Sequence, residues 1–162
     1  LVRGEIDKEP FETTIDLKVD AYIPSDYIDD EVQKIQVYKK IASIDSKESM
    51  MDIQEEIEDR FSDIPLCIYN LINIAYIKSV ANKIGIEEIK ERPMEVEVKF
   101  QSRDFINQGL VKNILKKYNK RVVFKVGQEP VLGFSLKDVK KTELIQNLKE
   151  FLEYIQSVVE TP

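Results

Sequence analysis

Apolar residues recur at helical spacing through most of the first half of the chain, and three helices are predicted there. The first covers residues 30–44, with Asp29 as its N-cap. The second begins after Ser46 and has one apolar and one acidic side. The third begins near Pro65, is apolar on most sides and ends at Gly85, so we expect neighbouring elements to bury it. The inward positions expected on the first two helices are Val32, Ile35, Tyr38, Ile41 and Ala42, then Met50, Ile53, Ile57 and Phe61.

Alternation of apolar and polar residues marks the extended segments. Over residues 15–23 it predicts a short strand or extended segment lying on the core. Beyond Gly85 it predicts strands at 86–89, 94–100, 122–126 and 132–136, the last two forming a hairpin. A helix is expected over residues 105–118, facing inward through Ile106, Leu110, Val111, Ile114 and Leu115, and a long final helix from Leu144 to Val158. The order predicts an α+β fold, with a helical N-terminal half packed with a small, mostly antiparallel sheet and a long C-terminal helix.

Length and composition place these elements in one domain. The chain has 162 residues, of which 43% are hydrophobic, enough for one core. Residues 1–14 are polar and acidic and are interpreted as a linker from an upstream domain, leaving residues 15–162 as a single domain. The sequence starts without Met, which indicates a part of a larger protein. Its apolar runs are too short for a membrane span, and a cytoplasmic location is expected.

Missing residue types exclude several kinds of chemistry. The chain has no His and a single Cys, so it can form neither a Ser-His-Asp triad nor a structural zinc site of Cys and His ligands. Its five glycines are scattered and form no phosphate-binding loop. The acidic runs at residues 26–31 and 55–59 are interpreted as helix capping and as a solvated helix surface. We therefore expect no catalytic residue, metal or cofactor in this chain.

Charge is distributed unevenly along the chain. Residues 1–63 contain 8 Lys or Arg and 18 Asp or Glu, whereas residues 64–162 contain 16 and 12. The basic residues of the second half include a cluster without acids, which is either a solvated face or a surface for nucleic acid. Because the whole chain is acidic, we regard nucleic-acid binding as the alternative function. The cluster consists of Lys112, Lys116, Lys117, Lys120 and Arg121.

The acidic side of the second predicted helix is the other candidate site. Glu56, Asp59 and Arg60 share one helical face because residues three and four apart are neighbours. They form either an internal Glu56–Arg60 pair or a charged patch offered to another domain. The residue pattern leaves both interpretations open.

Several segments resemble a known family in the same order and spacing. They are residues 15–28, from Ile15-Asp16-Leu17 to Asp26-Tyr27-Ile28, then Gln33 with Tyr38-Lys39-Lys40-Ile41-Ala42-Ser43, Glu56-Ile57-x-Asp59-Arg60-Phe61 with Pro65, Leu71 to Ala75, and Ala81-x-Lys83-Ile84-Gly85-Ile86. The chain is thereby similar to the C-terminal domain of the bacterial transcription-repair coupling factor (Mfd) family. It departs from the family at Ser62, where Gly is usual, and at Lys34 and Lys39, where Arg is frequent.

The resemblance implies a regulatory, non-enzymatic role within a larger machine. Parent proteins of the family are ATP-dependent DNA translocases that push stalled RNA polymerase off damaged DNA and recruit UvrA for nucleotide excision repair. Their ATP-binding motors lie upstream of this domain. The domain packs against an N-terminal UvrB-like module and hides its UvrA-binding surface. By motif position, that contact corresponds to Glu56, Asp59 and Arg60 here.

Overall fold

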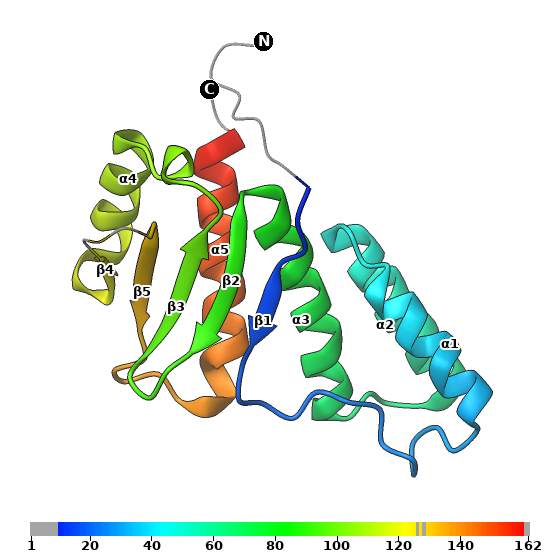
Figure 1. Ribbon diagram of the computed structural model, residues 1–162. Helices are drawn as coiled ribbons and strands as arrows, with labels where there is room; N and C mark the ends of the chain where they lie inside the picture. The colour runs from blue at the N-terminus through cyan, green and yellow to red at the C-terminus, as the bar shows by residue number, and fades with distance from the viewer. Residues whose placement is uncertain (1–9, 126, 128, 161–162) are drawn as a thin grey trace. The chain divides into compact units, whose positions relative to one another are not determined.

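Helices form one part of the chain and a five-stranded sheet with two helices forms the other (Figure 1). This computed structural model describes residues 10–125, 127 and 129–160. Contacts divide the chain into two compact units, residues 18–80 and residues 81–162 together with the segment up to Leu17. The predicted α+β class is confirmed. Residues 1–9 of the predicted linker lie outside the described residues, and the division into a linker and a single domain stays a prediction.

The helical unit contains α1 (Glu31–Ala42), α2 (Lys47–Phe61) and most of α3 (Leu66–Lys83). The N-cap of α1 is Asp30 and not the predicted Asp29, because the Asp30 carboxylate accepts the Gln33 N–H at 3.0 Å. Ser46 caps α2 as predicted. Its hydroxyl accepts the Ser49 N–H at 3.0 Å, and the Ser49 hydroxyl accepts the Ser46 N–H in return.

The face that α1 buries matches the predicted one at Ile41 but differs elsewhere, and Ala42, also expected inward, is exposed. Val32 and Ile35 are 65% and 52% exposed, whereas Val37 and Ile41 are buried. Two apolar stripes overlap on this helix, and the stripe of Val37 and Ile41 is the one that the core takes up. Tyr38 stays at the edge, where its hydroxyl accepts the Ile23 N–H at 2.9 Å. In contrast, α2 buries the predicted face, with Met50 and Ile57 inside and Ile53 and Phe61 half-buried.

Helix α3 is buried along most of its length, as its apolar circumference predicts. Only its first residue, Leu66, is a large apolar side chain left 64% exposed. The chain leaves the helix through Gly85, whose φ of 83° is readily adopted by glycine. A Cβ at this position would lie 2.5 Å from the Phe105 ring, so the close packing of Phe105 also requires glycine here.

The sheet contains β1 (Thr14–Asp16), β2 (Ile86–Glu91), β3 (Glu95–Phe100), β4 (Val122–Phe124) and β5 (Val131–Ser135) in the order β1-β2-β3-β5-β4. The β1–β2 pairing is parallel and the other three are antiparallel, which confirms a mostly antiparallel sheet. The predicted hairpin is β4–β5. Only Thr14–Asp16 of the first extended segment pairs with the sheet, although side-chain burial alternates as far as Ile23.

One predicted boundary in this unit is wrong. The helix expected over 105–118 is a short 3-10 turn, Arg103–Phe105, followed by α4 (Gln108–Tyr118). The break arises at Asn107, whose side chain caps α4 by accepting the Leu110 N–H at 2.8 Å. Capping there leaves Leu115 43% exposed, although it was expected to face inward. Val126, the last residue of the predicted β4 strand, lies outside the described residues.

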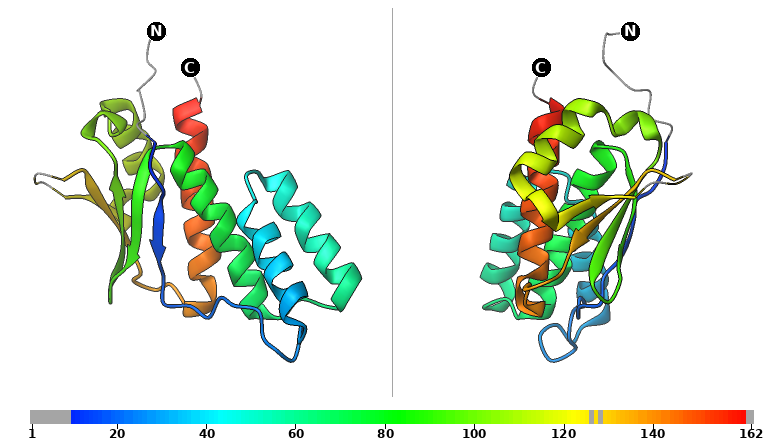
Figure 2. Two further views of the ribbon diagram at one scale, coloured as in Figure 1. Left: turned by 45° about the vertical axis from the view of Figure 1, so that its right-hand side comes forward. Right: turned by 90° about the vertical axis from the view of Figure 1, so that its left-hand side faces the viewer.

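Helices α4 and α5 (Leu144–Glu160) cover the same face of the sheet (Figure 2). The sheet meets them through the predicted period-two positions, since Val96, Val98 and Phe100 are at most 1% exposed. Phe134 of β5 stacks on Phe151 of α5 with ring centroids 4.8 Å apart. The buried side of α5 consists of Leu144, Ile145, Leu148, Phe151, Leu152 and Ile155.

The other face of the sheet carries a cluster of charges. The Lys125 ammonium donates hydrogen bonds to the carboxylates of Glu95 and Glu97, the latter at 2.7 Å. Arg92 Nε donates to Glu97 Oε1 at 2.9 Å. Hydrogen bonds from Lys125 and Arg92 hold the pKa of Glu97 below its ordinary value, while burial opposes them. The hydrogen bond to Glu95, followed by the one to Glu97, raises the pKa of Lys125.

The lowered pKa of Glu97 predicts an acid-sensitive contribution to stability. Because the folded-state pKa lies below the unfolded value, the contribution is present above about pH 4.3 and is lost as the pH falls through the folded pKa. Lys125→Met should reduce the fall of the unfolding free energy between about pH 6 and pH 3. Urea unfolding at each pH measures this. Lys112→Met serves as the control, and an equal effect of both substitutions would contradict the assignment.

Ser62 is the C-cap of α2, and its backbone has a conformation that is found almost only in glycine. Its φ of 131° and ψ of −172° fall in the region that costs other residues about 1–3 kcal/mol. The chain is held there by two contacts of this residue. The Ser62 N–H donates to Glu58 O at 3.2 Å, and the Tyr27 hydroxyl donates to Ser62 O at 2.6 Å. Ser62, one of the positions at which this sequence departs from the resembling family, is therefore a strained helix C-cap.

Ser62→Gly is predicted to stabilise the protein by about 1 kcal/mol, because relief of strain exceeds the added entropy of the unfolded chain. The same substitution at Ser43, the C-cap of α1, should be neutral or destabilising. Ser43 has an ordinary φ of −85°, and its hydroxyl donates to Lys40 O. Equilibrium unfolding in urea compares the two variants. A loss of stability in Ser62→Gly would show that the conformation is not strained.

Candidate protein-interaction surface

The outward side of α2 is a nearly continuous acidic face. The helix is anchored through Met50 and Ile57, which turns the remaining positions toward solvent. Like charges three and four residues apart repel each other, so this arrangement weakens the isolated helix. We call it the acidic face of α2; its members are the exposed residues Asp52, Glu55, Glu58 and Asp59.

Glu56 forms ion pairs on both sides of this face. Its carboxylate accepts Lys40 Nζ of α1 at 2.7 Å from Oε1 and lies 3.7 Å from Arg60 Nη1. The predicted internal Glu56–Arg60 pair therefore exists, but Lys40 is the closer partner. Sequence reasoning missed Lys40 because the register between two helices is not encoded in the spacing of either one. Glu56 thus links α1 to α2.

Asp59 differs from Glu56 although both were predicted as contact residues. It is exposed, and its carboxylate forms no ion pair or hydrogen bond within the part of the chain that the structure describes. The same holds for ion pairs of Asp52, Glu55 and Glu58 among the described residues. Arg60 lies beside Asp59 and places its guanidinium 4.9 Å from the Phe61 ring centre. A positively charged partner would therefore meet unpaired carboxylates around Asp59, with Arg60 held at their edge.

The predicted basic cluster belongs to the sheet unit. Lys112, Lys116 and Lys117 are exposed on α4, and Lys120 and Arg121 follow in a 3-10 turn, Asn119–Arg121. The structure does not join this cluster to the acidic face in one compact unit. Lys117 Nζ lies 5.0 Å from the Tyr154 ring centre, and Arg121 donates to Asn147 Oδ1 at 3.2 Å.

Two further features of the described residues bear on function. Within residues 10–125, 127 and 129–160, no group of three metal-ligating side chains is arranged to hold an ion. Across the same residues, no helix combines the length and hydrophobicity needed to cross a bilayer.

Comparison with known proteins decides the family. The profile of the TRCF domain matches residues 17–110, which include α1, α2 and the acidic face. This chain belongs to the TRCF domain family. A crystal structure of the C-terminal domain of a transcription-repair coupling factor superposes on it with a TM-score of 0.80 and 26% identity, covering 93% of this chain and 95% of that one. The resemblance inferred from the sequence is confirmed.

Two curated relatives show how far the likeness extends. The transcription-repair-coupling factor of Staphylococcus haemolyticus is 35% identical over 103 residues, which cover 62% of this chain and 9% of that protein. The factor of Borreliella burgdorferi is 25% identical over 154 residues, covering 95% of this chain and 14% of that protein. The TRCF domain thus corresponds to a small part of each relative's length.

Substitutions on α2 can separate the paired carboxylate from the unpaired ones. Glu55→Gln should stabilise the TRCF domain by about 0.2–0.5 kcal/mol, because it removes like-charge repulsion. Glu56→Gln should destabilise it by about 0.2–1 kcal/mol, because it breaks the pairs with Lys40 and Arg60. Both substitutions change the net charge by the same amount on the same helix. Urea unfolding at low ionic strength measures them, and equal signs would contradict the assignment.

Proposed function

We propose that this TRCF domain is a regulatory, autoinhibitory protein-interaction domain without catalytic activity of its own. The observation that carries the proposal is the acidic face of α2, whose carboxylates have no ion-pair partner among the described residues. A helix surface that repels itself is stabilised when a basic partner covers it. Family membership supports the same interpretation, since residues 17–110 match the TRCF domain.

The parent protein that we propose is a cytoplasmic, ATP-dependent DNA translocase of transcription-coupled nucleotide excision repair. It would release stalled RNA polymerase and recruit UvrA, and ATP would bind in its motor and not in this domain. The partner of the acidic face is then the N-terminal UvrB-like module of the same chain. The small share of each relative's length that this domain covers, 9% and 14%, supports a role beside a separate motor.

Asp59 and Glu56 have different tasks in this proposal. Asp59 contacts the partner directly, because its carboxylate is exposed and has no partner of its own among the described residues. Glu56 is a positioning residue, which holds α2 against α1 through Lys40 and fixes Arg60 from the other side. Arg60 then offers a cation at the edge of the acidic face, which would favour a partner of mixed charge over a purely basic one.

The energetics suit a contact that has to open. Exposed ion pairs contribute about 0.2–1 kcal/mol each, so a few of them hold two domains together reversibly. An interface of this kind is polar and modest, as interfaces between domains of one chain commonly are. Coupling between sites is reciprocal, so UvrA binding to the uncovered module would also favour release of this domain.

The proposal is tested by titrating the separate N-terminal module of the parent with this chain and its variants, using calorimetry at low salt. Asp59→Lys should weaken binding about tenfold, because a favourable charge contact becomes a repulsive one. Glu56→Lys combined with Asp59→Lys should abolish binding. Asp29→Lys is the charge-matched control, since Asp29 is also exposed in the helical unit but lies off the acidic face.

Equal affinities of wild type and the double variant would rule out the acidic face as the contact. Weakening by Asp29→Lys to the same degree as by Asp59→Lys would indicate that net charge alone matters. Urea unfolding of each variant confirms that binding is compared between folded proteins.

A further inference from the structure

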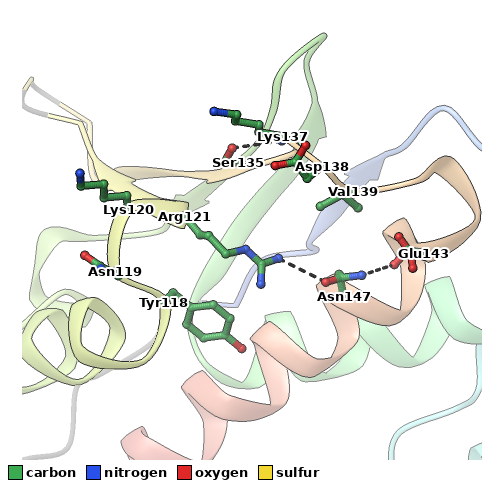
Figure 3. A pocket seen from close by; sticks show the side chains of 10 residues that line it. All are labelled: Tyr118, Asn119, Lys120, Arg121, Ser135, Lys137, Asp138, Val139, Glu143 and Asn147. Atoms are coloured by element: carbon green, nitrogen blue, oxygen red, sulfur yellow. Dashed lines mark hydrogen bonds between the residues drawn. The ribbon is translucent and has the colours of Figure 1, made fainter.

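A cleft of about 580 Å³ opens in the sheet unit and shares no residue with the acidic face of α2. It lies where the turn after α4, the segment after β5 and the start of α5 come together (Figure 3). Three of its residues are cations, and two of those belong to the basic cluster that the sequence predicts. The lining consists of Tyr118, Asn119, Lys120, Arg121, Ser135, Lys137, Asp138, Val139, Glu143 and Asn147.

The cations of the cleft lack the carboxylate partners that other cations of this unit have. Lys99, Lys125 and Lys141 each form an ion pair. By contrast, neither Lys120 nor Lys137 forms an ion pair within the described part of the chain. Lys116, one turn earlier at the end of α4, also has none among those residues. The positive charge at this end of the unit is therefore available to an external anion.

Arg121 is held in place at the centre of the cleft. Its guanidinium lies 4.9 Å from the Phe134 ring centre. It also donates one hydrogen bond to Asn147 Oδ1, which Figure 3 shows. Asn147 is itself fixed, since its amide nitrogen donates to Glu143 O at 2.7 Å. A guanidinium has five N–H donors, so most of those of Arg121 remain for a ligand. An arginine held in this way loses little side-chain entropy when it binds a phosphate.

The ring of Tyr118 is not available for stacking on a base. It packs edge-on against Phe134, Phe151 and Tyr154 with centroid distances of 5.0 to 6.0 Å. Burial also raises the pKa of its hydroxyl. A ligand in this cleft therefore meets cations and amide groups but no free aromatic ring, which is the chemistry of backbone binding without recognition of bases.

We propose that this cleft binds the phosphodiester backbone of duplex DNA without reading its sequence. Its three cations are Lys120 and Arg121 in the turn after α4 and Lys137 in the segment after β5. A ligand that contacts all three presents several anions in a fixed array, as a duplex does with its regularly spaced phosphates. A flexible acidic peptide would have to be ordered first, at a cost in entropy. The two carboxylates of the lining, Asp138 and Glu143, reduce the attraction for phosphates and keep the contact weak.

Binding is measured by fluorescence anisotropy of a labelled duplex of about 20 base pairs, titrated with the 162-residue chain at about 25 to 200 mM salt. We expect two unrelated sequences to bind equally. The logarithm of the association constant should fall with the logarithm of salt concentration with a slope of about −3. Lys120→Ala and Lys137→Ala should each weaken binding about threefold or more. Each should also make the slope less steep, by about 0.9.

Two further variants serve as controls, one for loss of folding and one for nonspecific effects of charge. Asp138→Asn should tighten binding, because it removes an anion from the cleft and asparagine tolerates the φ of 62° at this position. Lys39→Ala, an exposed lysine of the helical unit, should leave affinity and slope unchanged. A gain of affinity in one variant cannot result from unfolding.

Several outcomes would overturn the proposal. They are no binding at the lowest salt, an unchanged slope in the lysine variants, and weakening by Lys39→Ala equal to that by Lys120→Ala. Displacement of the duplex by polyglutamate of equal total charge, as effectively as by unlabelled duplex, would instead assign the cleft to an acidic peptide. None of these results bears on Asp59, so this proposal and the autoinhibitory one fail separately.

Discussion

Phe134 of β5 stacks on Phe151 of α5 with ring centroids 4.8 Å apart, and this contact joins the sheet to its long C-terminal helix. The arrangement of residues around the cleft depends on it. The Tyr118 ring packs edge-on against both phenyl rings, which ties the end of α4 to the same centre. The Arg121 guanidinium then rests on the outer side of Phe134. An apolar contact between elements distant in the sequence thus sets the position of a surface cation.

Parts of the fold with a single way to bury their apolar residues could be predicted from the sequence. Strand β3 alternates without interruption, so only one face can be buried, and Val96, Val98 and Phe100 occupy it. Helix α1 offers two overlapping apolar stripes, and only its contact with the rest of the unit selects Val37 and Ile41 over Val32 and Ile35. The first residue of α1 is ambiguous in the sequence for a similar reason, because Asp29 and Asp30 can both serve as the N-cap of a helix.

The candidate sites show the same limit. Helical spacing predicts that Glu56, Asp59 and Arg60 lie on neighbouring positions of α2, and they do. It cannot predict that Lys40 reaches Glu56 from another helix and leaves Asp59 as the unpaired acid. The basic cluster was recognised as a run in the sequence, but Lys137 was missed because it reaches the cleft from the segment after β5. Lys125 follows this cluster closely in the sequence, and yet Glu95 and Glu97 bind it.

The strained cap at Ser62 also affects how stably the last turn of α2, and with it part of the acidic face, is folded. Asp59 and Arg60 lie in the last turn of α2, directly before the residue whose conformation is unfavourable. Helix ends fray more readily than helix centres, and a strained cap lowers the free energy needed for that local opening. Opening of this one turn would disperse the charges while Met50 and Ile57 stay buried. In the proposed contact, the last turn of the acidic face would therefore have its own local folding equilibrium, and a partner that covers it would bind and order the turn in the same step.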